Sequence, residues 1–201
     1  LGPKITSTIP ITQPIRIPFD GRSRKYRAGI WLAYPGLFLV LAGDAVRYSI
    51  GWFGWGVLVV GLVVATIGFL AANNPIKTLA RIPIPLFLLF GLMLASVIWS
   101  QYRPQTLMSL GMQIGASLFA LFLANQFGWR QLLNILANTI RAILLSSLIF
   151  ELIAAIFGPI KPPFPNYEGD TPPAPAYFWS QGNLFDGDRI QGIVGNANLI
   201  A

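Results

Sequence analysis

The sequence contains no cysteine and no histidine, and only 10% of its 201 residues are charged. Without cysteine there can be no disulfide and no thiolate chemistry, and without either residue the usual ligands of zinc are missing. The absence of histidine also removes the side chain best suited to proton transfer near neutral pH. We therefore expect neither a cofactor nor a bound metal.

The residues that are abundant are typical of a membrane protein. Hydrophobic residues make up 54% of the chain, and six Trp, fourteen Phe and twenty Gly are among its 201 residues. A soluble domain carries about 25% charged residues, well above the value here. The net charge of +7 could suggest nucleic acid. The basic residues, however, are spread along hydrophobic stretches rather than gathered on one face. We expect the lipid bilayer as partner and no nucleic acid.

Five stretches are long and apolar enough for a helix that crosses a bilayer, which needs about 20 mostly apolar residues. They are 28–46, 52–72, 82–99, 106–127 and a span within 132–157, and a sixth run begins at Gly195. The predicted fold is an all-α, polytopic transmembrane bundle of five spanning helices plus the start of a sixth. A basic tail (1–27) precedes the spans (28–157), and a proline-rich loop (158–188) and a closing motif (189–201) follow them.

The positive charges predict the orientation of the chain, because lysine and arginine are enriched in cytoplasmic loops. Nine lie on the side of the amino terminus: Lys4, Arg16, Arg22, Arg24, Lys25, Arg27, Lys77, Arg81 and Arg130. Four lie on the opposite side: Arg47, Arg103, Lys161 and Arg189. This bias predicts a cytoplasmic amino terminus, a retained first helix and an extracytoplasmic loop at 158–188.

Ionisable residues inside spanning segments are costly and suggest function. Asp44 and Arg47 are three residues apart and can pair along a helix, while Arg141 can extend its side chain to the cytoplasmic interface. Glu151 lies too deep for such an escape, so it is predicted to face the bundle interior. Two interpretations stay open for it: a structural ion pair, or a role in the functional site. Arg103 is a possible supporting cation on the outer side.

The closing stretch, DGDRIQGIVGNANLIA, places an arginine just before a new apolar run. Asn196 or Asn198 could cap a helix that starts there, and a helix start offers free N–H donors to an anion. Arg189 adds a planar fork that grips phosphate oxygens, and Gly192 and Gly195 let the backbone come close to a ligand. Together these residues predict a phosphate cradle at the outer interface. The alternative is an interface anchor, or a partner for the two acids that precede the arginine.

The loop before this motif holds seven prolines between residues 158 and 188, which predicts an extended segment poor in regular structure. It ends in the aromatic stretch YFWSQGNLF, at 177–185. Such residues usually form the interfacial belt, and stacking on a sugar or a lipid is the alternative.

These residues resemble a known family. Arg189-x-x-Gly192, followed by Asn196, Asn198, Leu199 and Ala201, is similar to the signature of the O-antigen ligase and polysaccharide polymerase family. The stretch SVIWSQYRPQTL, at 96–107, resembles a second element of that family, and the likeness covers about 82–201.

The resemblance implies a GT-C type membrane glycosyltransferase in the bacterial cytoplasmic (inner) membrane. Such enzymes transfer a glycan from undecaprenyl pyrophosphate to a lipid A core or a sugar chain without a metal, and Arg189 matches the arginine thought to hold the pyrophosphate. Their catalytic base is thought to be a histidine in a later loop, and this chain has none. We therefore expect the chain to be the N-terminal part of the enzyme, without catalytic residues and inactive without its C-terminal half. The alternatives are a transporter of a small solute or inorganic carbon, which would use Glu151, and a non-catalytic membrane subunit.

Overall fold

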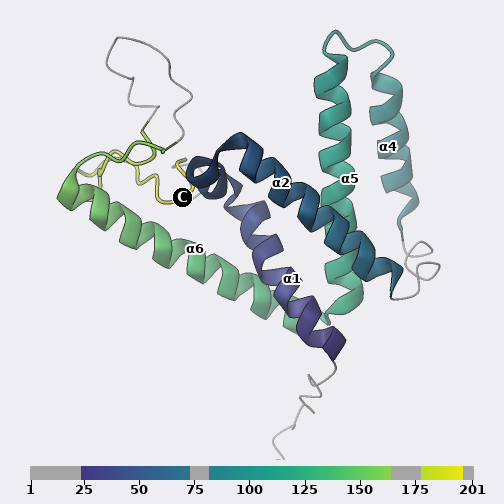
Figure 1. The fold of residues 1–201 in the computed structure, drawn as a ribbon, viewed down its shortest axis with the longest axis horizontal. Helices are drawn as coiled ribbons and strands as arrows, with labels where there is room; N and C mark the ends of the chain where they lie inside the picture. Colours follow the sequence, from purple (N-terminus) through teal and green to yellow (C-terminus); the bar gives the residue numbers. More distant parts are fainter. Residues whose placement is uncertain (1–23, 73–81, 164–177, 197–201) are drawn as a thin grey trace, which may run out of the picture.

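The computed structural model describes residues 24–72, 82–163 and 178–196 (Figure 1). In these ranges the chain forms the helices α1 (Arg24–Leu41), α2 (Gly43–Ala71), α4 (Ile84–Ser96), α5 (Arg103–Gln126) and α6 (Trp129–Phe157). The described part of the chain has no β-strand, and its only β-pairing is an isolated bridge between Ile160 and Ser180. The prediction of an all-α fold is confirmed.

Three of the helices, α2, α5 and α6, are long and apolar enough to cross a membrane. At 29 residues, α6 is about 43 Å long and exceeds the roughly 30 Å hydrocarbon core of a bilayer. The other two are shorter: α4 has 13 residues, and α1 has 18, beginning with the sequence RKYR. The architecture fits a multi-pass membrane protein, and the number of five spans stays a prediction.

The first predicted span, 28–46, is not one helix. Helix α1 ends at Leu41, Ala42 leaves the helical conformation with φ −123° and ψ 35°, and α2 begins at Gly43. Ala42 and Ala45 are buried against Ile143 of α6, so two small side chains let this corner pack closely. The sequence did not predict the break at Ala42, because the apolar run continues through it. A second interruption follows at Gly51 inside α2, where φ is +76°.

The remaining helices begin and end near the predicted positions because breakers lie there. Pro83 precedes α4, and Pro104 stands in the first turn of α5, where a missing N–H costs no hydrogen bond. Gly128 precedes α6, and Gly158 ends it with φ +95°, a conformation that glycine adopts without strain. The boundaries of the last predicted spans therefore agree with the structure to within a few residues.

Aromatic side chains form the core between α1, α2 and α5. Phe122 is fully buried and meets Phe69 edge-to-face, with ring centroids 4.9 Å apart. The ring of Phe119 fills the space that Gly36 leaves on α1, where a Cβ would overlap it. In lipid, helices associate through such close packing rather than through a hydrophobic driving force. Large apolar residues, among them Phe53 and Phe157, point outward, as expected of a lipid-facing surface.

The arrangement leaves one half of α6 to contact residues 178–196. Helices α4 and α5 lie side by side, α2 packs against α5, and α1 packs against both α2 and α6. The carboxyl-terminal half of α6 extends past α1, and residues 178–196 lie along it (Figure 1). The described part of the closing motif therefore packs against α6.

Candidate functional site

A buried stripe on α6 forms the floor of the site. Thr139, Ile143, Ser147 and Glu151 follow one another at four-residue spacing, which places them on one face of the helix. All four are buried, and Glu151 is only 1% exposed. The prediction that Glu151 faces the interior is confirmed.

Glu151 binds the backbone of the closing motif. Its Oε1 accepts hydrogen bonds from the N–H groups of Gln191 (2.9 Å) and Gly192 (2.6 Å), and its Oε2 accepts one from the hydroxyl of Ser180 (2.9 Å). Among the described residues no Lys or Arg forms a salt bridge with it. In this part of the chain its partners are hydrogen-bond donors, and the ion-pair interpretation stays a prediction. Its carboxylate anchors the segment that contains the arginine-glycine motif.

Further hydrogen bonds fix the residues around this anchor. The N–H of Ile193 donates to the Ser147 hydroxyl (3.3 Å), and its carbonyl accepts from the indole N–H of Trp179 (2.7 Å). The side-chain carbonyl of Gln191 accepts from the N–H of Gln181 (3.1 Å). Irregular backbone near a membrane needs protein partners for its polar groups, and these bonds supply them. Residues 191–193 are thus held from both sides.

Two glycines of the motif, Gly192 and Gly195, allow the backbone conformation that these contacts require. Gly192 has φ +58°, and its N–H is directed to Glu151 rather than to an open site. Gly195 has φ +64°, and a Cβ there would overlap the ring of Tyr48. Both positions favour glycine because other residues rarely adopt positive φ. Their role in the structure is to shape the segment, whereas the sequence suggested a close approach to a ligand.

Arg189 lies on the exposed stretch 185–189, two residues before the anchored Gln191. The same stretch carries Asp186 and Asp188, both exposed. The turn at its start is closed by a hydrogen bond from the N–H of Asp186 to the carbonyl of Asn183 (3.2 Å). The structure therefore presents the arginine at the surface, next to backbone that the buried carboxylate fixes.

The other predicted site residues lie apart from this anchor or outside the described residues. Asn196 is the last described residue, and Asn198 and the apolar run that was predicted to start a helix lie outside the described ranges from residue 197 on. Arg103 is exposed at the start of α5 and donates to the carbonyl of Ile98 (3.4 Å). No contact joins it to 178–196 in the described part of the chain, so the structure does not bring it together with the motif.

The predicted pair of Asp44 and Arg47 is confirmed, with a separation of 3.1 Å. The guanidinium also lies over two rings, 4.5 Å from the centroid of Trp52 and 5.1 Å from that of Tyr48. Tyr48 in turn contacts Trp179, with centroids 5.5 Å apart. The corner at the start of α2 therefore supports the motif segment from the side opposite α6.

Trp179 has a structural role that sequence reasoning missed. Its ring packs between Tyr48 and Phe150, and its N–H is bound to the backbone of the motif. It is therefore engaged within the protein, while Phe185 on the same stretch is 75% exposed. Ser180, Ser147 and Tyr48 were missed as well. The four-residue spacing of Ser147 and Glu151 was the signal in the sequence that could have identified the face of α6 that contacts residues 178–196.

Several basic and acidic residues on which the predicted topology depends lie outside the described ranges. They are Lys4, Arg16, Arg22, Lys77, Arg81, Glu168 and Asp170.

Comparison with protein families, curated proteins and solved structures finds no match for this chain. Its function must therefore be argued from the site itself.

The site combines an exposed cation with a rigid support. The N–H groups of Gln191 and Gly192 are bound to Glu151, and the guanidinium of the exposed Arg189 is a group that can recognise an anion. An arginine binds phosphate or carboxylate oxygens through parallel N–H donors. The arrangement suits binding of an anionic group, with no nucleophile or general base in contact with it in the described residues.

Proposed function

We propose that this chain forms part of the donor site of a membrane glycosyltransferase of the O-antigen ligase and polysaccharide polymerase type. In this proposal Arg189 binds the pyrophosphate of a polyprenyl carrier at the outer face of the membrane. The observation that carries the proposal is the anchoring of the adjacent Gln191 and Gly192 amides by buried Glu151. A binding group on fixed backbone loses less conformational entropy when the ligand arrives.

The arginine would also assist the transfer step. When the glycan leaves the carrier, the bond from the sugar to the pyrophosphate breaks and negative charge develops on the departing oxygens. A cation placed against these oxygens stabilises that charge, and such electrostatic stabilisation is often the largest contribution to catalysis. The acceptor would be a lipid-linked core or a growing sugar chain. The base that activates its hydroxyl is not assigned to a residue of this chain, which has no histidine.

The proposal is preferred over solute transport because of the bonding of Glu151. A transporter would need this carboxylate as a ligand for a coupling ion near the middle of the membrane. Both of its oxygens accept hydrogen bonds from the protein itself. Opening the site to an ion would leave two backbone N–H groups without acceptors, which is costly in a buried environment.

The proposed topology, with a cytoplasmic amino terminus, can be tested by cysteine labelling, because the chain has no cysteine of its own. Asp186→Cys lies on the exposed stretch beside Arg189, and Gly128→Cys lies at the exposed start of α6. In intact cells we expect a membrane-impermeant maleimide to label Asp186→Cys at once. Gly128→Cys should react only after the membrane is opened. The reverse pattern, or equal labelling of the two variants, contradicts the topology.

The proposed ligand can be tested by binding, independently of turnover. We expect the purified protein in neutral detergent to bind a polyprenyl pyrophosphate more tightly than the polyprenol of the same chain length. A charge-assisted contact accounts for about ten- to a hundred-fold between the two. Isothermal titration calorimetry measures both affinities, and inorganic pyrophosphate should compete with the lipid. Equal affinity for the pyrophosphate and the alcohol would reject a pyrophosphate site and with it the proposed function.

A further inference from the structure

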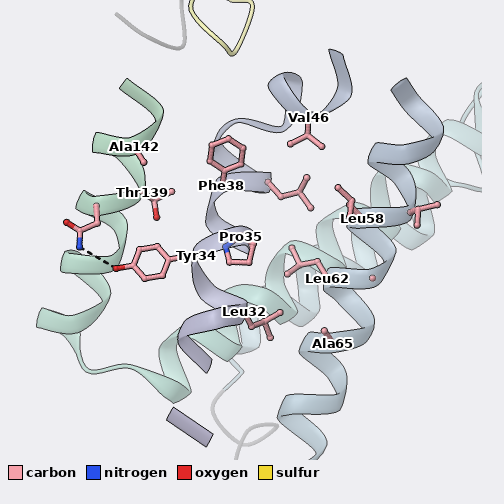
Figure 2. Close-up of a pocket in the computed structure, with 15 residues that line it drawn as sticks. Leu32, Tyr34, Pro35, Phe38, Val46, Leu58, Leu62, Ala65, Thr139 and Ala142 are labelled. Atoms are coloured by element: carbon pink, nitrogen blue, oxygen red, sulfur yellow. Dashed lines mark hydrogen bonds between the residues drawn. The ribbon is translucent and has the colours of Figure 1, made fainter. Parts of the chain in front are cut away.

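An apolar groove with a volume of about 810 Å³ lies between α1, α2 and α6 (Figure 2). Helix α1 forms its floor with Leu32, Pro35 and Phe38. The walls come from α2, with Leu58 and Leu62, and from α6, with Thr139 and Ala142. The lining is almost entirely hydrocarbon, so the groove suits an apolar occupant.

Small residues keep this groove open. Gly61 on α2 has no atom within 4 Å of the position that a Cβ would take, and Ala65 lies one turn further along the same wall. Pro35 lines the facing side of α1. Helices in a membrane usually bring such residues into direct contact. Here α1 and α2 leave space over them, which a flexible hydrocarbon chain can fill.

At one edge of the groove, polar side chains form a chain of hydrogen bonds that includes the cation Arg141. The side-chain amide of Asn138 donates to the Tyr34 hydroxyl (3.3 Å; dashed line in Figure 2). The side-chain carbonyl of Asn138 accepts from the guanidinium of Arg141 (3.3 Å). Arg141 is exposed, and its neighbours Leu144 and Leu145 are exposed apolar residues. It forms no salt bridge with any described residue. A cation on a lipid-facing helix surface calls for an anion close by.

The position of Arg141 along α6 allows its guanidinium to reach the level of the lipid headgroups. Arg141 lies twelve residues after Trp129, which is at most about 18 Å from the start of α6. Because α6 is about 43 Å long and the hydrocarbon core about 30 Å thick, part of its first turns can lie outside the core. The long arginine side chain covers several more ångströms toward the interface.

We propose that the groove binds an anionic phospholipid. One acyl chain lies between α1, α2 and α6, and the phosphate contacts Arg141 and Asn138. A helix from a second copy is the main competing occupant, and it would need a free acid to meet the arginine. The acids in the described helices are both engaged, Asp44 with Arg47 and Glu151 with the motif segment. The charge therefore favours a lipid, and this inference does not depend on the proposed transferase function.

The test uses the whole chain reconstituted in vesicles with equal amounts of phosphatidylglycerol and phosphatidylcholine. Native mass spectrometry then measures which phospholipids remain bound after gentle extraction. We expect retained phosphatidylglycerol to exceed phosphatidylcholine, and Arg141→Gln to lower this preference about ten-fold. Arg130→Gln, at an exposed arginine near the start of the same helix, should leave it unchanged. Arg141→Lys should keep part of the preference, since the charge remains.

A second pair of variants tests the groove. Gly61→Leu adds a side chain at a groove position where a Cβ meets no atom within 4 Å, and Gly111→Leu adds the same side chain at an equally open position on α5. We expect Gly61→Leu to lose retained phospholipid of both headgroups, and Gly111→Leu to keep it. Two results overturn the proposal: equal preference in Arg141→Gln and Arg130→Gln, or full retention in Gly61→Leu. If Gly61→Leu keeps its lipid but loses a dimer, the occupant is a second copy and the lipid site is rejected.

Discussion

Replacing Glu151 with alanine should lower the free energy of unfolding by about 2–4 kcal/mol and release the motif segment from α6. The variant leaves the N–H groups of Gln191 and Gly192 and the hydroxyl of Ser180 without their acceptor in a buried site. Each unsatisfied group costs about 1–3 kcal/mol, and water entering the new space recovers part of this. Thermal unfolding followed by tryptophan fluorescence measures the loss.

Hydrogen exchange locates the same effect in the chain. The amides of Gln191 and Gly192 are protected by Glu151, so we expect Glu151→Ala to speed their exchange on the order of a hundred-fold. Glu151→Gln should be milder, because its carbonyl can still accept from the two amides while its NH₂ faces the Ser180 oxygen. Unchanged exchange at 191–193 in Glu151→Ala would show that the carboxylate does not hold the segment.

Two adjacent serines provide a matched control for the anchor. Ser147 accepts the N–H of Ile193 across the contact, whereas the hydroxyl of Ser146 donates to the carbonyl of Ala142 within its own helix. Ser147→Ala should therefore raise exchange at Ile193 modestly, in line with the loss of one hydrogen bond of about 1 kcal/mol. Ser146→Ala should leave the motif segment as protected as in the parent protein.

The helices could be predicted from the sequence because apolar length and breakers set most of their boundaries. The runs that became α5 and α6 end at charges, prolines or glycines, and no tertiary information was needed to find them. The break at Ala42 could not be predicted in the same way. It depends on packing of Ala42 and Ala45 against Ile143, a contact between residues about a hundred positions apart.

The site was predicted only in part, for a related physical reason. The burial of Glu151 followed from its position in an apolar helix, and the arginine-glycine motif was visible as a pattern. The partners of the carboxylate could not be inferred, because two of them are backbone N–H groups that every residue except proline carries. The packing of Trp179 between Tyr48 and Phe150 was equally hidden, since an aromatic residue near a membrane surface usually indicates an interfacial belt.

Arg189→Ala should weaken binding of polyprenyl pyrophosphate by about ten- to a hundred-fold while the fold stays intact. The side chain is exposed, so its removal leaves no cavity. Arg189→Lys should recover little of the affinity, because an ammonium keeps the charge but loses the planar pair of donors. Under the proposed transferase function, the loss in turnover should exceed the loss in affinity, since the leaving pyrophosphate gains charge in the transition state.

Neutral variants of the neighbouring acids distinguish anion binding by Arg189 from a purely structural ion pair. If Arg189 only pairs with Asp186 or Asp188, then Asp186→Asn or Asp188→Asn should damage the protein as much as Arg189→Ala. If Arg189 binds the anion, removing an adjacent negative charge should leave the affinity unchanged or raise it. Lys161→Ala controls for a general loss of positive charge, because Lys161 is a nearby loop cation that lies over the ring of Phe178 instead.

The central claim is that Arg189, supported by the Glu151 anchor, binds the pyrophosphate of a lipid carrier. The most direct measurement is the dissociation constant for polyprenyl pyrophosphate, determined by titration calorimetry on Arg189→Ala, Lys161→Ala, Asp186→Asn and the parent protein in one detergent. We expect a weakening of about ten-fold or more in Arg189→Ala alone. An unchanged dissociation constant in Arg189→Ala, or an equal loss in Asp186→Asn, would contradict the account.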